Sequence, residues 1–476
     1  MRALVSIHRW LGVAFCLFFA MWFATGIVMH FVPFPALTEA ERLAGLLPLD
    51  PAALRAAPRA AAVAATLPDA VRVRLIARHD GPVFVVEHAA GITAVRAADL
   101  APAAVRTGNL AVTLAAAHAR QRGMPANAIR FMELADYDQW TVSNGLDAHR
   151  PLYRLALGDP AGTEFYVSSA TGEIVRDTTA HQRGWNYAGS VLHWVYPTVL
   201  RSHWRVWDAT VWTLSLGATI AAISGGVVGL LRLRIVRRRV ASPFRGWQAW
   251  HHWLGLGCLV FVLTWIFSGW LSMDHSRLFS NGQLTASETA AFADSSVWKK
   301  DLPAAPPFAA GQTREIEWFA FAGRIYRRER LTLESQQLAV VGENARPGGM
   351  FLEAADIARV AHRLGSNCAP AIRVTPGDHY PAASTLPDAP VYRIVCGSVW
   401  FQVDGANGAP LEKLDGSRRA YRWLYQALHT LDFPALSARP RLRTAMIVLL
   451  CGLGTLFSVT AIVIGWRRLR NRRASL

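Results

Sequence analysis

Charged residues are scarce in this sequence of 476 residues. Asp, Glu, Lys and Arg make up 17% of it, whereas they account for about a quarter of an ordinary soluble domain. Hydrophobic residues reach 52%, which excludes an intrinsically disordered chain and favours a membrane protein. Acidic residues are the scarcer of the two charged kinds: 33 of them stand against 50 basic ones, so the formal net charge is +17.

Cysteine is also rare. Five cysteines in the whole chain exclude a small scaffold held together by many disulfides. Cys16, Cys258 and Cys451 each lie in an apolar run, where neither water nor an oxidant is expected. Cys368 and Cys396 remain as candidates for one structural disulfide, and the sequence leaves the paired and the unpaired state open.

Several catalytic signatures are missing. The chain has no phosphate-binding P-loop, no H-E-x-x-H zinc motif, no G-x-S-x-G nucleophile motif and no C-x-x-C-H motif for covalent haem. Gly255-Leu-Gly257 and Gly452-Leu-Gly454 are fragments of a dinucleotide-binding pattern, but both lie in apolar runs, where helix packing explains them better. We therefore expect no nucleotide or flavin site in this chain.

Four apolar runs without charge are present instead. At about 1.5 Å per residue, each is long enough to cross a hydrocarbon layer roughly 30 Å thick. The first run is too long for a signal peptide and no A-x-A-like cleavage site follows it, so it predicts a retained anchor. The runs cover residues 11–32, 209–231, 253–273 and 444–466.

Arginine clusters in the short connections between these runs. Arg2 and Arg9 precede the first run, and further clusters occupy the link 232–252 and the tail 467–476. Because such loops stay on the cytoplasmic side, we expect an N-in, C-in topology, with residues 33–208 and 274–443 outside, in a periplasm or its equivalent. This topology accounts for the high charge, so no nucleic-acid site is expected.

The two halves of the chain are similar to each other. At a constant offset of 236 residues, one set recurs in the second half: Gly172, His193, Gly229, Arg232, Leu233 and Arg234 correspond to Gly408, His429, Gly465, Arg468, Leu469 and Arg470. At an offset of 243, a second set recurs: His8, Trp10, Leu11, Gly12 and Gly26 correspond to His251, Trp253, Leu254, Gly255 and Gly269. An internal duplication of this kind predicts a pseudo-twofold molecule with paired sites.

Each outside loop is expected to form a small α+β domain. Strand, turn and strand patterns occur at 153–157 and 164–168, and again at 392–396 and 400–404, and a helix is expected at 351–363. The Ala- and Pro-rich stretch 50–68 predicts a linker or a weak helix. The expected divisions are cytoplasmic N-terminus and first span 1–32, first domain 33–182, interfacial segment 183–208, second span 209–231, basic loop 232–252, third span 253–273, second domain 274–417, interfacial segment 418–443, fourth span 444–466 and tail 467–476.

These motifs resemble those of the PepSY-associated transmembrane family. The resemblance rests on the two His-x-Trp-Leu-Gly starts at His8 and His251, on Ala-Thr-Gly-Glu-Ile-Val at 170–175, and on the Leu-His pairs that end at His193 and His429. It implies a bacterial inner-membrane protein with two periplasmic PepSY-like domains. Members similar to this chain include ferric-siderophore reductases with two b haems, although the fold alone does not fix the function.

The repeated histidines are candidate axial ligands for two b haems. His8 with His251 would hold one haem at the cytoplasmic ends of spans one and three, and His193 with His429 would hold another just outside spans two and four. A single interfacial histidine more commonly touches lipid head groups, so the argument depends on the pairing. Lower-ranked alternatives are His252, which competes with His251, and His30, Met273, His203 and His275 near the outer ends of the spans.

Aromatic residues crowd the expected outer interface. An aromatic belt at the lipid head groups explains most of them. Some could instead form a dock for a ferric chelate, with arginines attracting its negative charge. The candidate docking residues are Arg183, Arg201, Trp194, Arg418 and Arg419. Asp432 could accept a hydrogen bond from His429 or cap a turn before Pro434.

Taken together, these features predict a transmembrane conduit that passes electrons to an outer ferric substrate such as a ferric siderophore. The electron donor would be membrane quinol or a protein partner, and the sequence does not choose between them. One alternative is a non-enzymatic membrane anchor that binds a peptidase or an assembly partner. Another is a protein that senses or transfers haem without reducing a substrate.

Overall fold

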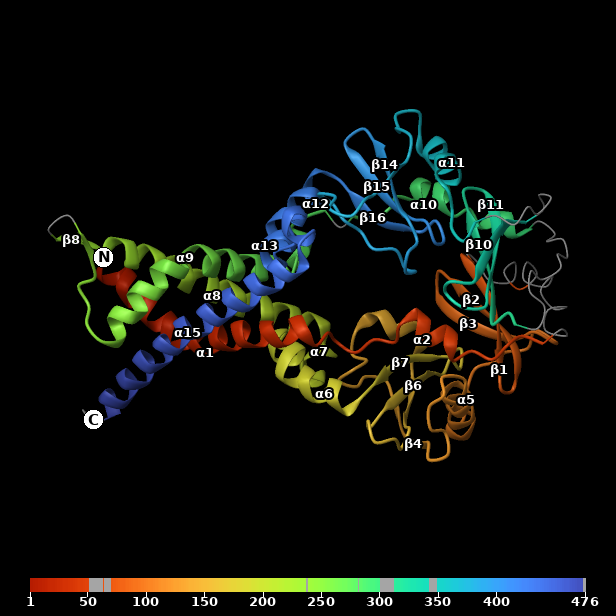
Figure 1. Cartoon of the computed structure of the whole chain (residues 1–476), viewed down its shortest axis with the longest axis horizontal. Coiled ribbons are helices and arrows are strands. Elements are labelled where there is room, and N and C mark those ends of the chain that lie inside the picture. The colour runs from red at the N-terminus through yellow and green to blue at the C-terminus, as the bar shows by residue number, and fades with distance from the viewer. Residues whose placement is uncertain are drawn as a thin grey trace.

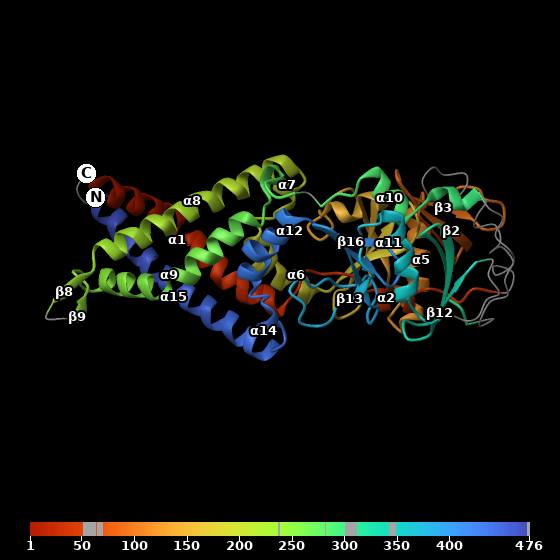
Figure 2. The ribbon, with the colours of Figure 1, turned by 90° about the horizontal axis from the view of Figure 1, so that it is seen from above.

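The computed structural model describes residues 1–50, 63, 70–236, 239–280, 282–299, 312–341 and 349–473. Long helices gather at one end of the molecule and most of the strands lie at the other (Figures 1 and 2). Helix α1 begins, and helix α15 ends, at the end of the bundle away from the strands; we name this the terminal end and the opposite one the sheet end (Figure 1). The expected linker 50–68 lies almost wholly outside the described residues.

Four of the described helices are long and apolar enough to cross a membrane. They are α1 (Arg2–Phe31), α8 (Trp204–Leu231), α9 (Trp247–Leu271) and α15 (Pro440–Arg473). Each begins several residues before the apolar run that predicted it, because the flanking polar residues continue the helix. The chain is thus a membrane protein with soluble α+β parts, and lipid contacts the outward faces of these helices.

Small residues let the four helices pack closely. A side-chain carbon at Gly454 would lie 2.6 Å from the ring of Phe23, and one at Gly217 would lie 2.5 Å from the ring of Phe15. Helix α1 packs against both α8 and α15, and α9 packs against the same two helices. Glycine therefore provides the close contacts that hydrophobic burial alone does not favour in lipid.

Two arms leave the sheet end of the bundle, and their elements follow the same order (Figure 1). The first arm contains α2 (Glu39–Ala44), β1 (Arg72–Arg78), β2 (Gly81–His88), β3 (Gly91–Arg96), α5 (Gly108–Gln121), β4 (Arg130–Ala135), η2 (Asn144–His149), β5 (Leu152–Ala156), β6 (Glu164–Ser168) and β7 (Ile174–Thr178). The second contains η4 (His275–Arg277), α10 (Ala286–Phe292), η5 (Ser295–Lys299), β10 (Glu315–Phe321), β11 (Arg324–Arg330), β12 (Gln336–Val340), α11 (Ala354–Leu364), β13 (Ile372–Arg373), β14 (Val391–Cys396), β15 (Val399–Asp404) and β16 (Pro410–Leu414).

Short helices connect each arm to the following long helix. In the first half these are α6 (Ala180–Asn186), the π-helical η3 (Tyr187–Val191) and α7 (Thr198–Arg201). In the second half they are α12 (Gly416–Tyr421), the π-helical η6 (Arg422–Ala427), α13 (Leu428–Thr430) and α14 (Pro434–Ser437). At the terminal end, α8 and α9 are joined by the hairpin β8 (Arg234–Val236) and β9 (Arg239–Ala241).

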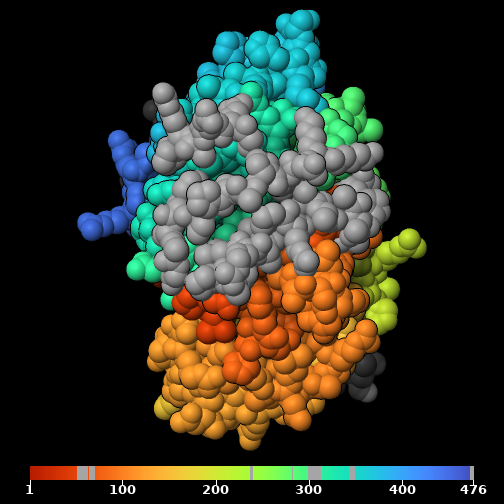
Figure 3. All heavy atoms as spheres, turned by 90° about the vertical axis from the view of Figure 1, so that its right-hand side faces the viewer, coloured from red at the N-terminus to blue at the C-terminus, as the bar shows by residue number. Residues whose placement is uncertain are grey.

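The two arms share one antiparallel sheet with the strand order β12-β11-β10-β1-β2-β3. Its central pair joins the halves of the chain, with Arg74 opposite Glu317 and Leu75 opposite Ile316. Each arm also has its own antiparallel sheet, β4-β5-β6-β7 or β13-β14-β15-β16. Figure 3 shows the end of the molecule distant from the bundle, with the first arm (orange) below the second (green to blue). The shared sheet was not foreseen from the sequence.

A network of buried ion pairs crosses this join. Arg74 Nη1 lies 2.6 Å from a carboxylate oxygen of Glu173 and 3.1 Å from one of Glu315, and Arg330 Nη2 lies 2.5 Å from Glu315. Arg42 of α2 adds a contact of 2.9 Å to Glu315. Although burial opposes ionisation, the arginines hold the pKa of Glu173 at about 2. The charges are thus neutralised locally, within a sheet whose opposite face is apolar.

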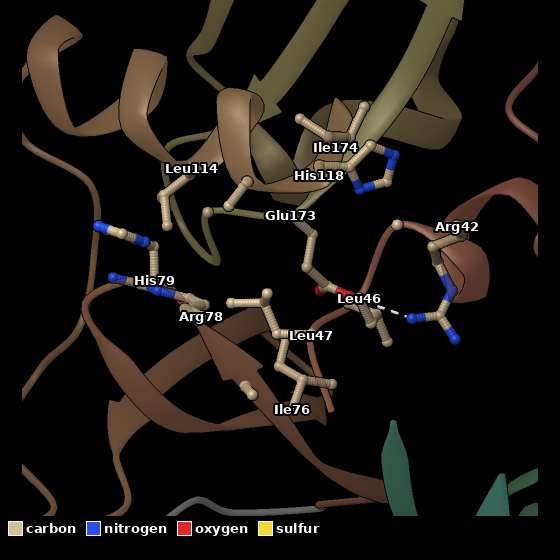
Figure 4. Close-up of a pocket in the computed structure, with 14 residues that line it drawn as sticks. Arg42, Leu46, Leu47, Ile76, Arg78, His79, Leu114, His118, Glu173 and Ile174 are labelled. Atoms are coloured by element: carbon tan, nitrogen blue, oxygen red, sulfur yellow. Dashed lines mark hydrogen bonds and ion pairs between the residues drawn. The ribbon is translucent and has the colours of Figure 1, made fainter. Parts of the chain in front are cut away.

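One pocket of about 40 Å³ lies beside this network (Figure 4). Its wall includes His118 of α5, Arg42 of α2 and Glu173 from the turn before β7. His118 is buried, and its Nε2 has no hydrogen-bond partner among the described residues. Burial, reinforced by the charges of Arg122 and Arg42, lowers the pKa of His118 to about 3. This histidine is therefore neutral at physiological pH.

A disulfide between Cys368 and Cys396 links the segment after α11 to the end of β14. The other three cysteines are free and buried. We expect a maleimide reagent to modify three cysteines in the denatured, unreduced protein and all five after reduction, because a disulfide does not react with it. Gel shift with a polymer-linked maleimide counts the modified cysteines. A Cys368→Ser, Cys396→Ser variant should show three modified cysteines both with and without reduction. Five modified cysteines without reduction would contradict the pairing.

The neutral imidazole of His118 predicts how stability depends on pH. Its pKa is about 3 in the folded protein and 6.5 ordinarily, so between these values the unfolded chain binds a proton that the folded chain does not. The contribution of His118 to the free energy of unfolding should therefore fall by about 1.4 kcal/mol for each pH unit between 6.5 and 3.

Melting temperatures of the detergent-purified protein between pH 7 and pH 5 measure this dependence. His118→Leu should flatten the profile, because leucine keeps the volume and removes the titrating group. An unchanged slope in this variant would show that other groups cause the dependence.

Candidate functional site

Two pairs of imidazole rings face each other in the helical bundle. The ring centroids of His8 on α1 and His251 on α9 lie 6.5 Å apart near the terminal end. Those of His193 and His429 lie 6.3 Å apart near the sheet end. The structure thus brings together the same two pairs that the sequence repeat predicted.

The sheet-end pair reaches the bundle on the short helices. His193 follows η3, which packs against α1, and His429 lies on α13, which packs with η6 against α9. In each half a π-helical stretch comes just before the histidine, and such stretches are frequent at functional sites. The two rings were expected just outside spans two and four. In space they lie between the long helices, beside Thr25 and Ser268.

Hydrogen bonds fix the tautomer of this pair. The Thr25 hydroxyl donates to the carbonyl of Met21, so its oxygen accepts from His193 Nδ1 at 2.9 Å. The Ser268 hydroxyl donates to the carbonyl of Trp265 and accepts from His429 Nδ1 at 3.2 Å. A proton on Nδ1 leaves Nε2 with a free lone pair, which is the form that binds a metal through Nε2.

The terminal-end pair follows the same rule. His251 Nδ1 donates to the oxygen of Thr460 at 2.9 Å, since the Thr460 hydroxyl itself donates to the carbonyl of Phe457. His8 Nδ1 donates to the carbonyl of Ala221 at 3.3 Å. All four imidazoles therefore have a bonded Nδ1 and an Nε2 available for coordination.

The separation of the rings matches coordination of one metal from two sides. A metal to imidazole nitrogen bond is about 2 Å long, and the ring centroid lies about 1 Å beyond the nitrogen, so two opposed ligands place their centroids about 6 Å apart. No group of three or more His, Cys, Asp or Glu side chains suited to a metal ion occurs among the described residues. A donor set of two imidazoles fits an axial site whose other four ligands belong to a flat macrocycle.

A cavity of about 630 Å³ adjoins the sheet-end pair, a volume within the usual range of ligand pockets. His193 and His429 line it together with His30, Met273 and many aromatic side chains. The aromatic lining consists of Trp22, Phe23, Trp194, Tyr196, Trp207, Trp265 and Tyr425. We name this space the sheet-end cavity.

The lower-ranked histidines have other partners. Both ring nitrogens of His252 are bonded, to Ser242 Oγ at 2.8 Å and to the carbonyl of Gly229 at 2.9 Å, so His251 is the better ligand. His30 Nε2 bonds to Thr444 Oγ1 at 2.9 Å, although the ring lines the sheet-end cavity. His275 pairs with Asp208 at 2.5 Å and lies outside the cavity lining.

The proposed docking arginines make local contacts. Arg183 donates to the carbonyls of Thr178 and Gly162. Arg201 is buried and bonds to Asn144, Arg418 pairs with Asp274, and Arg419 bonds to the carbonyls of Ser398 and Leu414. Trp194 alone of this set lines the sheet-end cavity. Asp432 contacts Arg422 and Ser437. The sequence suggested Asp432 as a hydrogen-bond partner of His429, but in the structure that partner is Ser268.

Sequence reasoning missed two residues of the site. Arg443 lines the sheet-end cavity but resembles an ordinary interfacial arginine at the start of a span. Gly225 of α8 lies against His8: a side-chain carbon there would be 2.6 Å from His8 Cε1. At Gly12 and at Gly257, by contrast, an added side-chain carbon would have no neighbouring atom within 4 Å.

Four spanning helices and two joined α+β arms define the chain as a multi-span membrane protein with large soluble parts. The sequence profile of the PepSY-associated TM region matches residues 5–468. The chain therefore belongs to the PepSY-associated transmembrane family, as its motifs indicated. No curated protein matches the sequence.

The contact of Gly225 with His8 gives a test of the terminal-end pair. A haem held by this pair would bind at least about tenfold more weakly in Gly225→Ala, because the added carbon overlaps Cε1 of His8 and displaces the ring. Titration of the purified apoprotein with haemin, followed by absorption, measures this. Gly257→Ala is the matched control, since it adds the same carbon where space is open. Equal haemin affinity in both variants would contradict the prediction that the contact between Gly225 and His8 positions the His8 ring.

Proposed function

We propose that this protein is a transmembrane di-haem b oxidoreductase that passes electrons to a ferric substrate outside the cytoplasm. The observation that carries the proposal is the presence of two imidazole pairs, each with both Nε2 atoms available, at opposite ends of the bundle. His8 and His251 would hold one b haem, and His193 and His429 the other. Each bound haem would supply reversible one-electron chemistry at its iron.

The two pairs lie far enough apart to span most of a membrane. His8 and Thr25, which bonds to His193, lie on one helix and are about 26 Å apart along its axis. Between the pairs, the ring of Phe23 lies 6.1 Å from those of both Phe261 and Trp265. These aromatic side chains occupy part of the space between the two sites.

The positions of arginine and cysteine support an assignment of the two sides of the membrane. The terminal end carries the basic link and the tail, and we place it in the cytoplasm of a bacterial inner membrane. A disulfide in the second arm supports an oxidising compartment, the periplasm, for the sheet end. Two halves with the same order of elements support an origin by internal duplication.

A ferric siderophore is the substrate class that we infer. Reduction of its iron needs no acid or base from the protein, and Fe(II) binds hard oxygen ligands less tightly than Fe(III), so the iron is released. The electrons would come from membrane quinol or from a protein partner at the terminal end. The protein would then serve iron acquisition.

An anchor that binds a peptidase or an assembly partner is the second candidate. The observation in its favour is strand β4 at the edge of its sheet, where Phe131, Met132 and Leu134 are exposed. Such an edge can add a strand from another protein. This reading requires no cofactor, and the spectrum of the purified protein separates the two candidates.

We expect the detergent-purified protein to contain two low-spin b haems per chain, measured by oxidised and dithionite-reduced spectra and a pyridine haemochrome assay. His193→Ala or His429→Ala should leave one haem, because one axial ligand is lost. His252→Ala should retain two, since both nitrogens of that ring are already bonded.

A ferric siderophore should reoxidise the dithionite-reduced protein. Haem that is present but never reoxidised by ferric chelates would favour a sensor or transfer protein. A colourless protein that does not take up haemin would overturn the proposed function.

A further inference from the structure

The sheet-end cavity is polar at one end and apolar at the other. Phe23, Ile266, Ile447 and Cys451 line it toward the middle of the bundle. His30 lies four residues beyond Gly26 on α1, about 6 Å nearer the sheet end, and bonds to Thr444. His30, Thr430 and Arg443 thus place ionisable and hydrogen-bonding groups of the lining where the bundle meets the arms.

Arg443 is the one arginine or lysine among the described residues that line this cavity. Its Nε and Nη2 donate to the carbonyl of Thr430 at 3.0 and 2.9 Å, which fixes the guanidinium beside the residue that follows His429. Nη1 makes no hydrogen bond within the described part of the chain. A held guanidinium with a free N–H in a largely apolar cavity is suited to an anion.

We infer that Arg443, with His30 beside it, binds the carboxylate edge of the macrocycle held between His193 and His429. This inference rests on the proposed function and adds to it the orientation of the group. A b haem has an apolar ring with two carboxylates on one edge, and burying a carboxylate without a cation is costly. The polarity of the cavity therefore directs the carboxylates toward the sheet end and the apolar edge toward the bundle.

The contact of Arg443 with the carboxylate also raises the reduction potential of the sheet-end centre. Arg443 neutralises one carboxylate and adds a positive charge near the iron, which disfavours the oxidised state because that state carries the larger positive charge. Arg443 is thus a positioning residue that makes this centre easier to reduce. It raises the tendency of electrons to collect at the end where the substrate arrives.

The test is a redox titration of the full-length protein in the His8→Ala background, which leaves the sheet-end centre alone. Arg443→Gln should lower the equilibrium constant for reduction about tenfold, which is about 59 mV for one electron. Arg443→Lys should restore most of it, because the charge returns. Arg441→Gln is the matched control, since Arg441 is exposed on the same helix and does not line the cavity.

Reconstitution with the dimethyl ester of haem distinguishes a carboxylate contact from a packing effect. The His8→Ala parent should bind haemin at least about tenfold more tightly than the dimethyl ester, because only haemin offers carboxylates to Arg443, and Arg443→Gln should lose this preference. A preference for haemin over the ester that persists in Arg443→Gln, or a shift in potential no larger in Arg443→Gln than in Arg441→Gln, would overturn the role of Arg443 and leave the proposed function intact. Absence of haem from the parent protein would overturn the proposed function itself.

Discussion

The absence of water inside a bilayer is the constraint on which this bundle depends. Polar groups there find their partners in the protein and not in water, and the hydroxyls of Thr25, Ser268 and Thr460 do so by donating to carbonyls of their own helices. Their oxygens then accept the Nδ1 protons of three imidazoles, and a carbonyl accepts the fourth. Because each Nδ1 carries the proton, the four Nε2 atoms are left unprotonated, which is the state that binds a metal.

The soluble arms contribute to the same geometry from outside the bundle. Helix α6 begins two residues after β7 ends, and α12 begins two residues after β16 ends, so each sheet-end histidine lies at the root of an arm. The pairing of β1 with β10 and the buried ions of Arg74, Glu315 and Arg330 hold the two arms to each other. A buried ion pair adds little net stability, but breaking one is costly, which favours a single arrangement of the arms.

Much of this architecture could be predicted from the sequence. The apolar runs gave the four helices, alternation gave the hairpins of each arm, and the offsets of 236 and 243 residues paired His8 with His251 and His193 with His429. The shared sheet could not be predicted, because Arg74 and Glu317 alternate with apolar residues as on a solvent-exposed strand face, and their burial depends on each other. Arg443 was missed for a similar reason, since a single arginine at the start of a span usually contacts lipid head groups.

The join between β1 and β10 has a consequence for the connectivity of the chain. The two strands occupy equivalent places in their arms and run antiparallel, which is the relation that a twofold axis produces between identical strands. The backbone of such an edge is complementary to itself, but the side chains are not, because Arg72 and Arg74 of β1 pair with Glu317 and Glu315 of β10. The seam therefore needs one copy of each strand, and the link between α8 and α9 supplies both in equal number on one polypeptide.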